Sequence, residues 1–277
     1  MADERGQRVH VGTVLRTERL GPHMIRVVLG GLPGFPAGTY TDHYVKLLFP
    51  QPGVTYPEPF DMARIRGEMP RAHWPATRTY TVRACDPDAG ELTIDFVHHG
   101  DVGLAGPWAA AARPGDVVRF LGPGGAYAPD PAADWHLLAG DESALPAIGA
   151  ALERMPAGAP AHVFVEVEGP QDQQKLATEA AADIRWLHRG SGPVGAGLVD
   201  AVRAFAFPGG AVQAFVHGEA GFVKLLRRHL RLERGVPLAR LSISGYWRLG
   251  RDEEGWRSSK REWNQQIEAE EARALAG

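Results

Sequence analysis

The hexapeptide Arg78-Thr79-Tyr80-Thr81-Val82-Arg83 decides how the rest of the sequence is interpreted. Threonine, tyrosine and valine favour extended backbone, so the stretch predicts a β-strand. Its side chains also suit a dinucleotide. Arg78 offers a planar fork of donors to a phosphate, while Tyr80 and Thr81 offer a flat ring and a hydroxyl to a ring system. An ordinary surface strand has the same composition, and these residues alone leave both interpretations open.

The first half of the chain consists of short alternating or apolar runs that are separated by turns rich in proline and glycine. Six runs predict strands: Val9–Leu15, Met24–Leu29, Tyr44–Phe49, Thr79–Ala84, Glu91–His98 and Asp116–Leu121. Six strands at this spacing indicate an antiparallel β-barrel. The polar segment Phe60–Trp74 predicts a long loop before the fourth strand.

A glycine-rich turn follows the fifth run, and it reads His98-His99-Gly100-Asp101-Val102-Gly103-Leu104-Ala105-Gly106-Pro107-Trp108. The alanine-rich run Trp108–Ala112 predicts a short helix, and a glycine-rich turn that opens a helix presents N–H groups to a phosphate. A plain tight turn is the simpler explanation of these residues alone. Adjacent histidines on a strand point to opposite faces, so we expect no metal site here.

The pattern changes after the turn-rich boundary Gly122–Pro131. Strands and helices then alternate, with strands predicted at Trp135–Ala139, His162–Val167, Ile184–His188, Val212–His217 and Leu241–Tyr246, and helices at Ala144–Arg154, Gln171–Ala182, Leu198–Phe205 and Ala220–Arg234. This order indicates a parallel sheet that is covered on both faces. The predicted fold class is α/β plus β, with an antiparallel β-barrel domain at 1–127 and a doubly wound parallel-sheet domain at 128–277.

Ligands of parallel sheets bind at the carboxyl ends of the strands, and two motifs stand at such ends. They are Gly140-Asp141-Glu142-Ser143-Ala144 and His217-Gly218-Glu219, and Ser143 could cap the helix that follows it. The run Gly190–Gly195 satisfies G-x-G-x-x-G. It follows the third strand, however, and lacks an acidic strand end about 20 residues later, so it predicts a flexible loop. Near the C-terminus, Ser259 and Glu262 predict a capping box for a last helix.

Composition excludes several classes of protein. The net charge of −3 gives no case for nucleic-acid binding, and the lone Cys85 excludes an intramolecular disulfide and an all-cysteine iron–sulfur cluster. Met1–Arg5 is charged with no apolar core behind it, which indicates no signal peptide. No apolar run approaches about 18 residues, so we expect no membrane span and a cytoplasmic location.

Beyond these patterns, the run Arg78–Gly100 resembles the R-x-Y-[ST] flavin signature of ferredoxin-reductase-like flavoproteins, in the form found in the siderophore-interacting protein family. Further matches follow in family order at Gly103–Asp116, Gly140–Ile148, His217–Glu219 and Ser242–Arg251. The resemblance implies a ferredoxin-reductase-like fold with an FAD-binding barrel and an NAD(P)H-binding sheet. Leu104 and Gly106 stand where the family pattern has proline and serine, so the contact expected from the serine hydroxyl is missing.

The resemblance also implies which residues bind the cofactors. FAD would be held by Arg78, Thr79, Tyr80, Thr81, Val97, His98, His99, Gly100, Gly103, Leu104, Ala105, Gly106 and Trp108. NADPH or NADH would be held by Asp141, Glu142, Ser143, Ala144, Gly218 and Glu219, with Tyr246 and Trp247 near the flavin. Electron transfer between two cofactors needs no acid–base pair, and we predict no catalytic residue.

The function that the resemblance implies is reduction of a ferric siderophore, with release of Fe(II) in the cytoplasm. Lys46, Arg248 and Arg251, with Arg64 and Arg66 behind them, would recruit the bulky anionic substrate, although each is also explained as a solvated charge. Two alternatives stay open: a reductase for a protein acceptor such as ferredoxin or flavodoxin, and a siderophore-binding module without turnover. The electron donor also stays open among NADH, NADPH and a ferredoxin, with Arg185, Arg189 and Arg227 as candidates for a 2′-phosphate.

Overall fold

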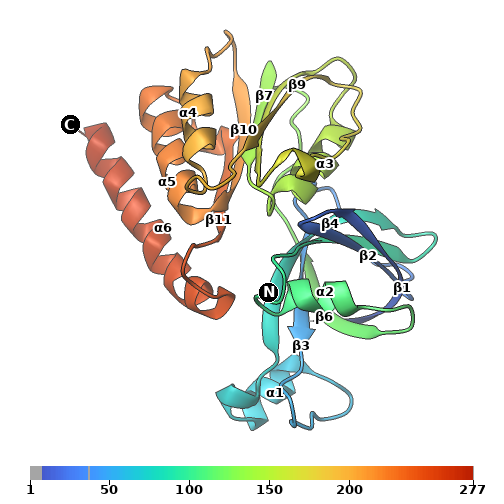
Figure 1. Cartoon of the computed structure of the whole chain (residues 1–277). Coiled ribbons are helices and arrows are strands. Elements are labelled where there is room, and N and C mark those ends of the chain that lie inside the picture. The colour runs from blue at the N-terminus through green and yellow to red at the C-terminus, as the bar shows by residue number, and fades with distance from the viewer. Residues whose placement is uncertain (1–7, 37, 277) are drawn as a thin grey trace. The chain divides into compact units, whose positions relative to one another are not determined.

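The computed structural model describes residues 8–36 and 38–276. The chain divides into two compact units, Met1–Ala126 and Tyr127–Gly277, which we call the barrel unit and the sheet unit (Figure 1). In the described part of the chain, no helix combines the length and the apolar composition that a membrane span requires.

Six antiparallel strands close the barrel unit in the order β1-β2-β5-β4-β3-β6. Their bounds are β1 Val9–Gly21, β2 Met24–Gly30, β3 Tyr44–Phe49, β4 Ala76–Asp86, β5 Glu91–Val97 and β6 Val117–Gly124. Inward-facing aliphatic and aromatic side chains fill the barrel, among them Val45, Leu47, Ile94, Phe96 and Phe120. The predicted antiparallel barrel is confirmed, because each run that alternates in the sequence supplies one wall of this core.

The segment predicted as a long loop holds a short helix, α1 (Met62–Glu68), and a 3₁₀ turn, Arg71–His73. The Asp61 carboxylate accepts a hydrogen bond from the Arg64 backbone N at 2.7 Å and so caps the helix. Met62 and Ile65 are buried one turn apart against the outside of the barrel. The prediction of a plain loop was wrong because a good cap and two apolar residues suffice for this helix, despite the polar average of the segment.

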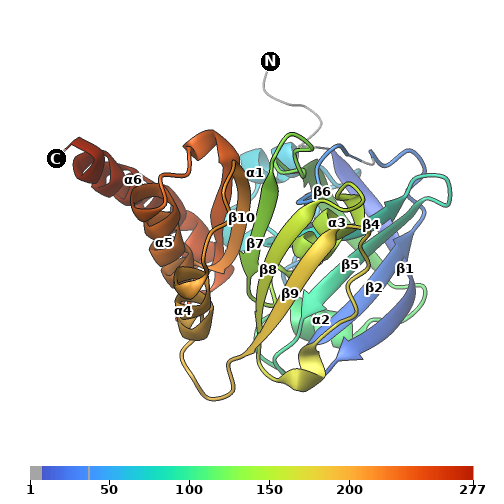
Figure 2. The ribbon, with the colours of Figure 1, turned by 90° about the horizontal axis from the view of Figure 1, so that it is seen from above.

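Five parallel strands form the sheet unit in the order β11-β10-β7-β8-β9. They are β7 Trp135–Gly140, β8 Pro160–Val167, β9 Ala181–His188, β10 Val212–Glu219 and β11 Leu241–Trp247. The central strand β7 is buried over its whole length, as expected of a strand covered on both faces. The helices α4 (Ala196–Ala204) and α5 (Ala220–Arg228) pack on one face, and α3 (Leu145–Arg154) lies on the other (Figure 2).

Two helix predictions in the sheet unit were wrong. The segment predicted as the helix Gln171–Ala182 begins in the 3₁₀ turn Pro170–Asp172 and then has no regular structure until β9. The last helix, α6 (Glu253–Ala276), begins before the predicted capping box, and Asp252 accepts a hydrogen bond from Gly255 N at its start. The Ser259 hydroxyl therefore lies inside the helix and donates to the carbonyls of the preceding turn.

Candidate functional sites

The strand β4 carries Arg78-Thr79-Tyr80-Thr81 on backbone that is paired with β3. The register between β3 and β4 runs from Ala76 to Thr81, and the register between β5 and β4 runs from Val82 to Asp86. The four motif residues therefore lie in the part of β4 that pairs with β3.

Aromatic rings join this strand to the glycine-rich turn. Tyr80 packs on Phe96 of β5 with 4.4 Å between ring centroids, and Phe96 packs on Trp108 of α2 (Ala105–Ala111) at 5.5 Å. Tyr80, Leu104 and Trp108 all lie partly buried against the barrel core. The rings thus connect the two motifs, which are separate in the sequence, through the buried Phe96.

The remaining residues of the strand motif differ in exposure. Thr81 is buried, Thr79 is exposed, and the half-buried Arg78 donates from Nη1 to the Thr77 carbonyl at 2.9 Å. Lys46 of β3 stands directly opposite Thr79 in the β3–β4 ladder, and both side chains are exposed. The predicted substrate cation Lys46 is therefore a neighbour of the motif strand.

The glycine-rich turn has the conformation that its glycines permit. Gly100 and Gly103 have φ angles of +61° and +87°, in the left-handed region that favours glycine. A Cβ at Gly106 would lie 2.9 Å from the Val97 carbonyl oxygen, which gives this glycine a packing role. The turn exposes His99, half-buries Val97, His98 and Leu104, and buries Ala105. The helix begins earlier than the predicted Trp108–Ala112, at Ala105.

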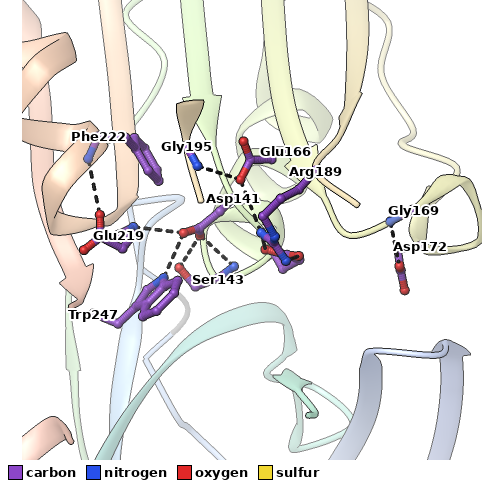
Figure 3. Close-up of polar contacts among 11 residues, drawn as sticks. Asp141, Ser143, Glu166, Gly169, Asp172, Arg189, Gly195, Glu219, Phe222 and Trp247 are labelled. Atoms are coloured by element: carbon purple, nitrogen blue, oxygen red, sulfur yellow. Dashed lines mark hydrogen bonds and ion pairs between the residues drawn. The ribbon is translucent and has the colours of Figure 1, made fainter. Parts of the chain in front are cut away.

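In the sheet unit, the parallel strands bring their carboxyl ends to one edge, where Asp141 is 0% exposed. Its Oδ1 accepts hydrogen bonds from the Ser143 backbone N (3.0 Å) and hydroxyl (2.6 Å). Its Oδ2 accepts from Glu219 N (2.9 Å) and from the Trp247 indole N (2.8 Å; Figure 3). Burial raises the pKa of Asp141 to about 6; the Glu142 carboxylate adds to this rise, and the hydrogen bonds from the Ser143 hydroxyl, the Trp247 indole and Glu219 N oppose it.

This network changes the role expected of Ser143. Its hydroxyl donates to Asp141 instead of capping α3, and the Asp141 carbonyl accepts from Ala144 N and Leu145 N at the start of the helix. The prediction of a serine cap was wrong because the aspartate two residues earlier competes for the hydroxyl.

Glu219 is the second carboxylate at this edge, and it caps α5. Its Oε2 accepts from Gly221 N at 2.5 Å and Phe222 N at 3.3 Å, and its Oε1 accepts from Leu249 N at 3.2 Å. Gly218 has a φ of +139°, and a Cβ there would lie 2.7 Å from the Asp141 carboxyl carbon. Glycine at this position therefore allows β10 and β7 to meet.

A third charged group at the strand ends was not predicted as a unit. Arg189, just after β9, donates to Glu142 at 2.7 Å and to Glu166 of β8 at 3.2 Å, and Glu166 also accepts from Gly195 N at 2.8 Å (Figure 3). All three charged side chains are nearly buried, with exposures of 11% or less. Glu166 was missed because its contacts come from residues more than one strand away in the sequence.

A polar cluster that the sequence did not indicate lies among β10, β11 and α6. His217 packs on Phe215 and Tyr246, and its Nε2 lies 2.9 Å from the Ser242 hydroxyl. Burial lowers the pKa of His217 to about 3, with the Lys260 charge acting in the same direction. Lys260 of α6 donates to the Ser244 hydroxyl at 2.9 Å, and burial lowers its pKa as well.

The structure thus brings some predicted residues of the sheet unit together and separates others. Asp141, Ser143, Gly218, Glu219 and Trp247 form one network, and Glu142 joins the Arg189 cluster. Ala144 is buried at the start of α3, Tyr246 packs on His217, and Arg248 and Arg251 are exposed in the tail.

Two family models match this chain. The model "Siderophore-interacting FAD-binding domain" matches residues 13–127, and "Siderophore-interacting protein" matches 133–250. Among curated relatives, the uncharacterized protein Rv2895c of Mycobacterium tuberculosis is 46% identical over 93% of this chain and 96% of its own length. The ferric vibriobactin reductase ViuB of Vibrio cholerae is 34% identical over 89% and 92%, and the NADPH-dependent ferric-chelate reductase of Escherichia coli is 33% identical over 85% and 91%.

Solved structures give the same result. The siderophore-interacting protein SipS of Aeromonas hydrophila superimposes with a TM-score of 0.79 at 32% identity, over 94% of this chain and 99% of that one. A ferredoxin reductase of carbazole 1,9a-dioxygenase, at a TM-score of 0.59, 15% identity and coverage of 87% and 70%, shares the fold. The chain therefore belongs to the siderophore-interacting protein family, with the ferredoxin-reductase-like fold, and its barrel unit is the FAD-binding domain of that family.

Proposed function

We propose that the chain is an FAD-dependent ferric-siderophore reductase that takes electrons from NADPH or NADH and releases Fe(II) in the cytoplasm. The observation that carries the proposal is the packing of Tyr80, Phe96 and Trp108, which joins the Arg78–Thr81 strand to the glycine-rich turn in a domain of an FAD-binding family. Support for the acceptor comes from the relatives named as ferric vibriobactin reductase and ferric-chelate reductase.

The residues of the barrel unit fit FAD. The guanidinium of Arg78 suits a phosphate, and the ring of Tyr80 suits the flavin ring system. A Cβ added at Gly100 or Gly103 would meet no described atom within 4 Å, so the turn leaves room beside its backbone. Bound FAD supplies the step that couples a two-electron hydride donor to a one-electron ferric acceptor.

Residues outside the FAD motifs would hold the strand ends of the sheet unit in place or attract the ferric siderophore. Asp141 fixes Glu219 and the Trp247 indole at the strand ends, and the Glu219 carboxylate fixes the start of the tail at Leu249. The exposed Lys46, Arg248 and Arg251 would attract an anionic ferric siderophore through long-range electrostatics. One NADPH or NADH carries two electrons and so reduces two ferric ions.

The proposal is tested by adding FAD, a nicotinamide nucleotide and a ferric siderophore to the purified chain, with a ferrous chelator as reporter. We expect chelator colour that depends on both FAD and the protein, with hydroxamate or catecholate siderophores. Ferric siderophore that binds without FAD-dependent colour would instead favour the binding module. Flavin reduction without colour would favour a protein acceptor.

A further inference from the structure

NADPH carries a 2′-phosphate on its adenosine ribose where NADH has a hydroxyl, so the choice between them depends on the residues that face this ribose. The inference rests on the proposed function, in which one of these donors reduces the flavin. In a doubly wound sheet the dinucleotide crosses the strand ends where the strand order reverses, here between β7 and β10. The ribose of the adenosine half is then read by groups at the end of the second strand, which is β8 in this unit. The residues that face a 2′-phosphate should therefore come from the β8 end and its neighbours.

The end of β8 holds the cluster of Arg189, Glu142 and Glu166. The guanidinium donates to both carboxylates, at 2.7 Å and 3.2 Å for the shortest contact with each. Glu166 is 1% exposed and Glu142 is 5% exposed, and the two carboxylates outnumber the single guanidinium. The cluster therefore carries a formal net charge of −1 when all three groups are ionised.

Arg189 is unsuited to bind a 2′-phosphate in this arrangement. To reach the phosphate, it would have to abandon two buried carboxylates, and uncompensated buried charge is strongly disfavoured. A dianionic phosphate would also meet the excess negative charge, whereas a neutral 2′-hydroxyl would meet no such repulsion. The α4 start offers little more, because Gly195 N already donates to Glu166 (Figure 3).

The other two arginines that the sequence suggested are also engaged by carboxylates. Arg185 donates to Asp183 at 2.7 Å and lies over the Phe164 and Phe205 rings. Arg227 makes a two-bond pair with Glu271 of α6, at 2.5 and 3.0 Å. We infer that the Arg189–Glu142–Glu166 cluster makes the chain select NADH over NADPH, unlike the Escherichia coli relative that is named NADPH-dependent.

The test compares flavin reduction by the two donors in the FAD-loaded full chain, by anaerobic stopped-flow absorbance. We expect the second-order rate constant for NADH to exceed that for NADPH by at least about tenfold, a difference that corresponds to ~1.4 kcal/mol. Calorimetric titration with NAD⁺ and NADP⁺ gives a readout without turnover, and NADP⁺ should bind the more weakly. Equal or faster reduction by NADPH would overturn the inference.

The variant Glu166→Gln removes one carboxylate charge and keeps the acceptor for Gly195 N. We expect it to shift the NADH-to-NADPH ratio toward NADPH by about tenfold, and the double variant with Glu142→Gln to shift it further. Asp183→Asn is the matched control, because it makes the same change beside Arg185 near the start of β9. A ratio that stays unchanged in Glu166→Gln and in the double variant, or that shifts equally in Asp183→Asn, overturns the assignment to this cluster.

Failure of this inference differs from failure of the proposed function. If neither nucleotide reduces the flavin but chemically reduced flavin still delivers electrons to a ferric siderophore, the donor inference falls and the reductase stands. If NADH reduces the flavin selectively but no ferric siderophore reoxidises it, the donor inference stands and the acceptor is wrong.

Discussion

The helix α2 of the barrel unit begins differently from the helices α4 and α5 of the sheet unit. In the barrel unit, α2 follows Leu104, a residue whose side chain has no hydrogen-bonding atom. In the sheet unit, the chain's own carboxylates fill the starts of α4 and α5, since Glu166 accepts from Gly195 N and Glu219 from Gly221 N and Phe222 N. No described side chain caps the start of α2, so its N–H groups suit a phosphate, whereas carboxylates already engage the N–H groups at the starts of α4 and α5. We therefore expect a resident FAD in the barrel unit and a transient donor at the sheet unit.

The largest effect should come from Asp141→Ala, which removes a fully buried carboxylate of the sheet unit. Donors on the half-buried Ser143 and Trp247 and on the buried Glu219 lose their acceptor, and each group that stays unsatisfied costs about 1–3 kcal/mol. The variant also no longer pays for burying the Asp141 charge, which offsets part of this cost. We therefore expect the free energy of unfolding by urea to fall by about 3 kcal/mol. Ser143→Ala, which removes one donor, should cost about 1 kcal/mol. A loss below about 1 kcal/mol in Asp141→Ala would show that the network does not support the fold.

The second effect concerns acid stability and His217. Its pKa falls to about 3 in the folded chain, below the ordinary value of 6.5, so the unfolded chain binds more protons between these values. The free energy of unfolding that His217 contributes is therefore lost as pH falls below 6.5, by about 1.4 kcal/mol per pH unit. Asp141 acts in the opposite direction: its raised pKa, about 6, makes the folded chain bind more protons as pH falls from about 6 to 4.

His217→Asn isolates the histidine contribution. Relative to the unchanged chain, the variant should become steadily more stable as pH falls from 6.5 toward 4, measured by urea unfolding at a series of pH values. The exposed His188→Asn makes the same chemical change at the surface and serves as the control. Parallel pH profiles for the unchanged chain and His217→Asn would contradict the burial of this ring.

A third effect should appear in FAD affinity. Tyr80→Ala removes the ring that packs on Phe96, and we expect the Kd for FAD to rise at least about tenfold, or ~1.4 kcal/mol. Tyr80→Phe keeps the ring and should stay within about threefold of the unchanged chain. Flavin fluorescence titration gives both constants. If the alanine and phenylalanine variants bind FAD equally well, the ring surface is not the flavin site.

The smallest effect is predicted for Lys46→Ala. Exposed charges contribute at most about 1 kcal/mol, so the KM for an anionic ferric siderophore should rise about two- to fivefold at low salt. The rise should vanish near 0.5 M salt, on the order of full screening at contact distances. Lys175→Ala, at an exposed lysine of the sheet unit, is the control. A KM change that persists at high salt would mean that Lys46 makes a direct contact instead of attracting the substrate at a distance.

The sequence predicted the strands well because their patterns are local. Alternating residues in the barrel and apolar runs in the sheet follow directly from which faces of a strand are buried. The barrel strand β3 and the sheet strand β7 are examples. Motif positions were predictable for the same reason, since turns and strand ends are marked by glycine. The distant contacts of the motif residues were harder to predict, because Asp141 accepts hydrogen bonds from Glu219 and Trp247, 78 and 106 positions away, only after the sheet forms.

The wrong helix at Gln171–Ala182 shows why local pattern fails. Its residues favour a helix, but the Thr178 hydroxyl donates to the Leu152 carbonyl at 2.7 Å and Glu179 accepts from Gly158 N. These contacts hold the segment along the end of α3, and tertiary structure overrides propensity. Lys260 was missed for a similar reason. The predicted helix start at Ser259 gave no sign that the Lys260 side chain is buried beside Ser244 of β11.

In the proposed reaction, electrons pass from flavin held by the barrel unit to siderophore-bound iron. The direct measurement is to photoreduce the FAD-loaded chain without air and mix it rapidly with a ferric siderophore and a ferrous chelator. We predict flavin reoxidation matched in time by chelator colour, with roughly two Fe(II) for each flavin. Flavin that stays reduced with both hydroxamate and catecholate siderophores would contradict the account.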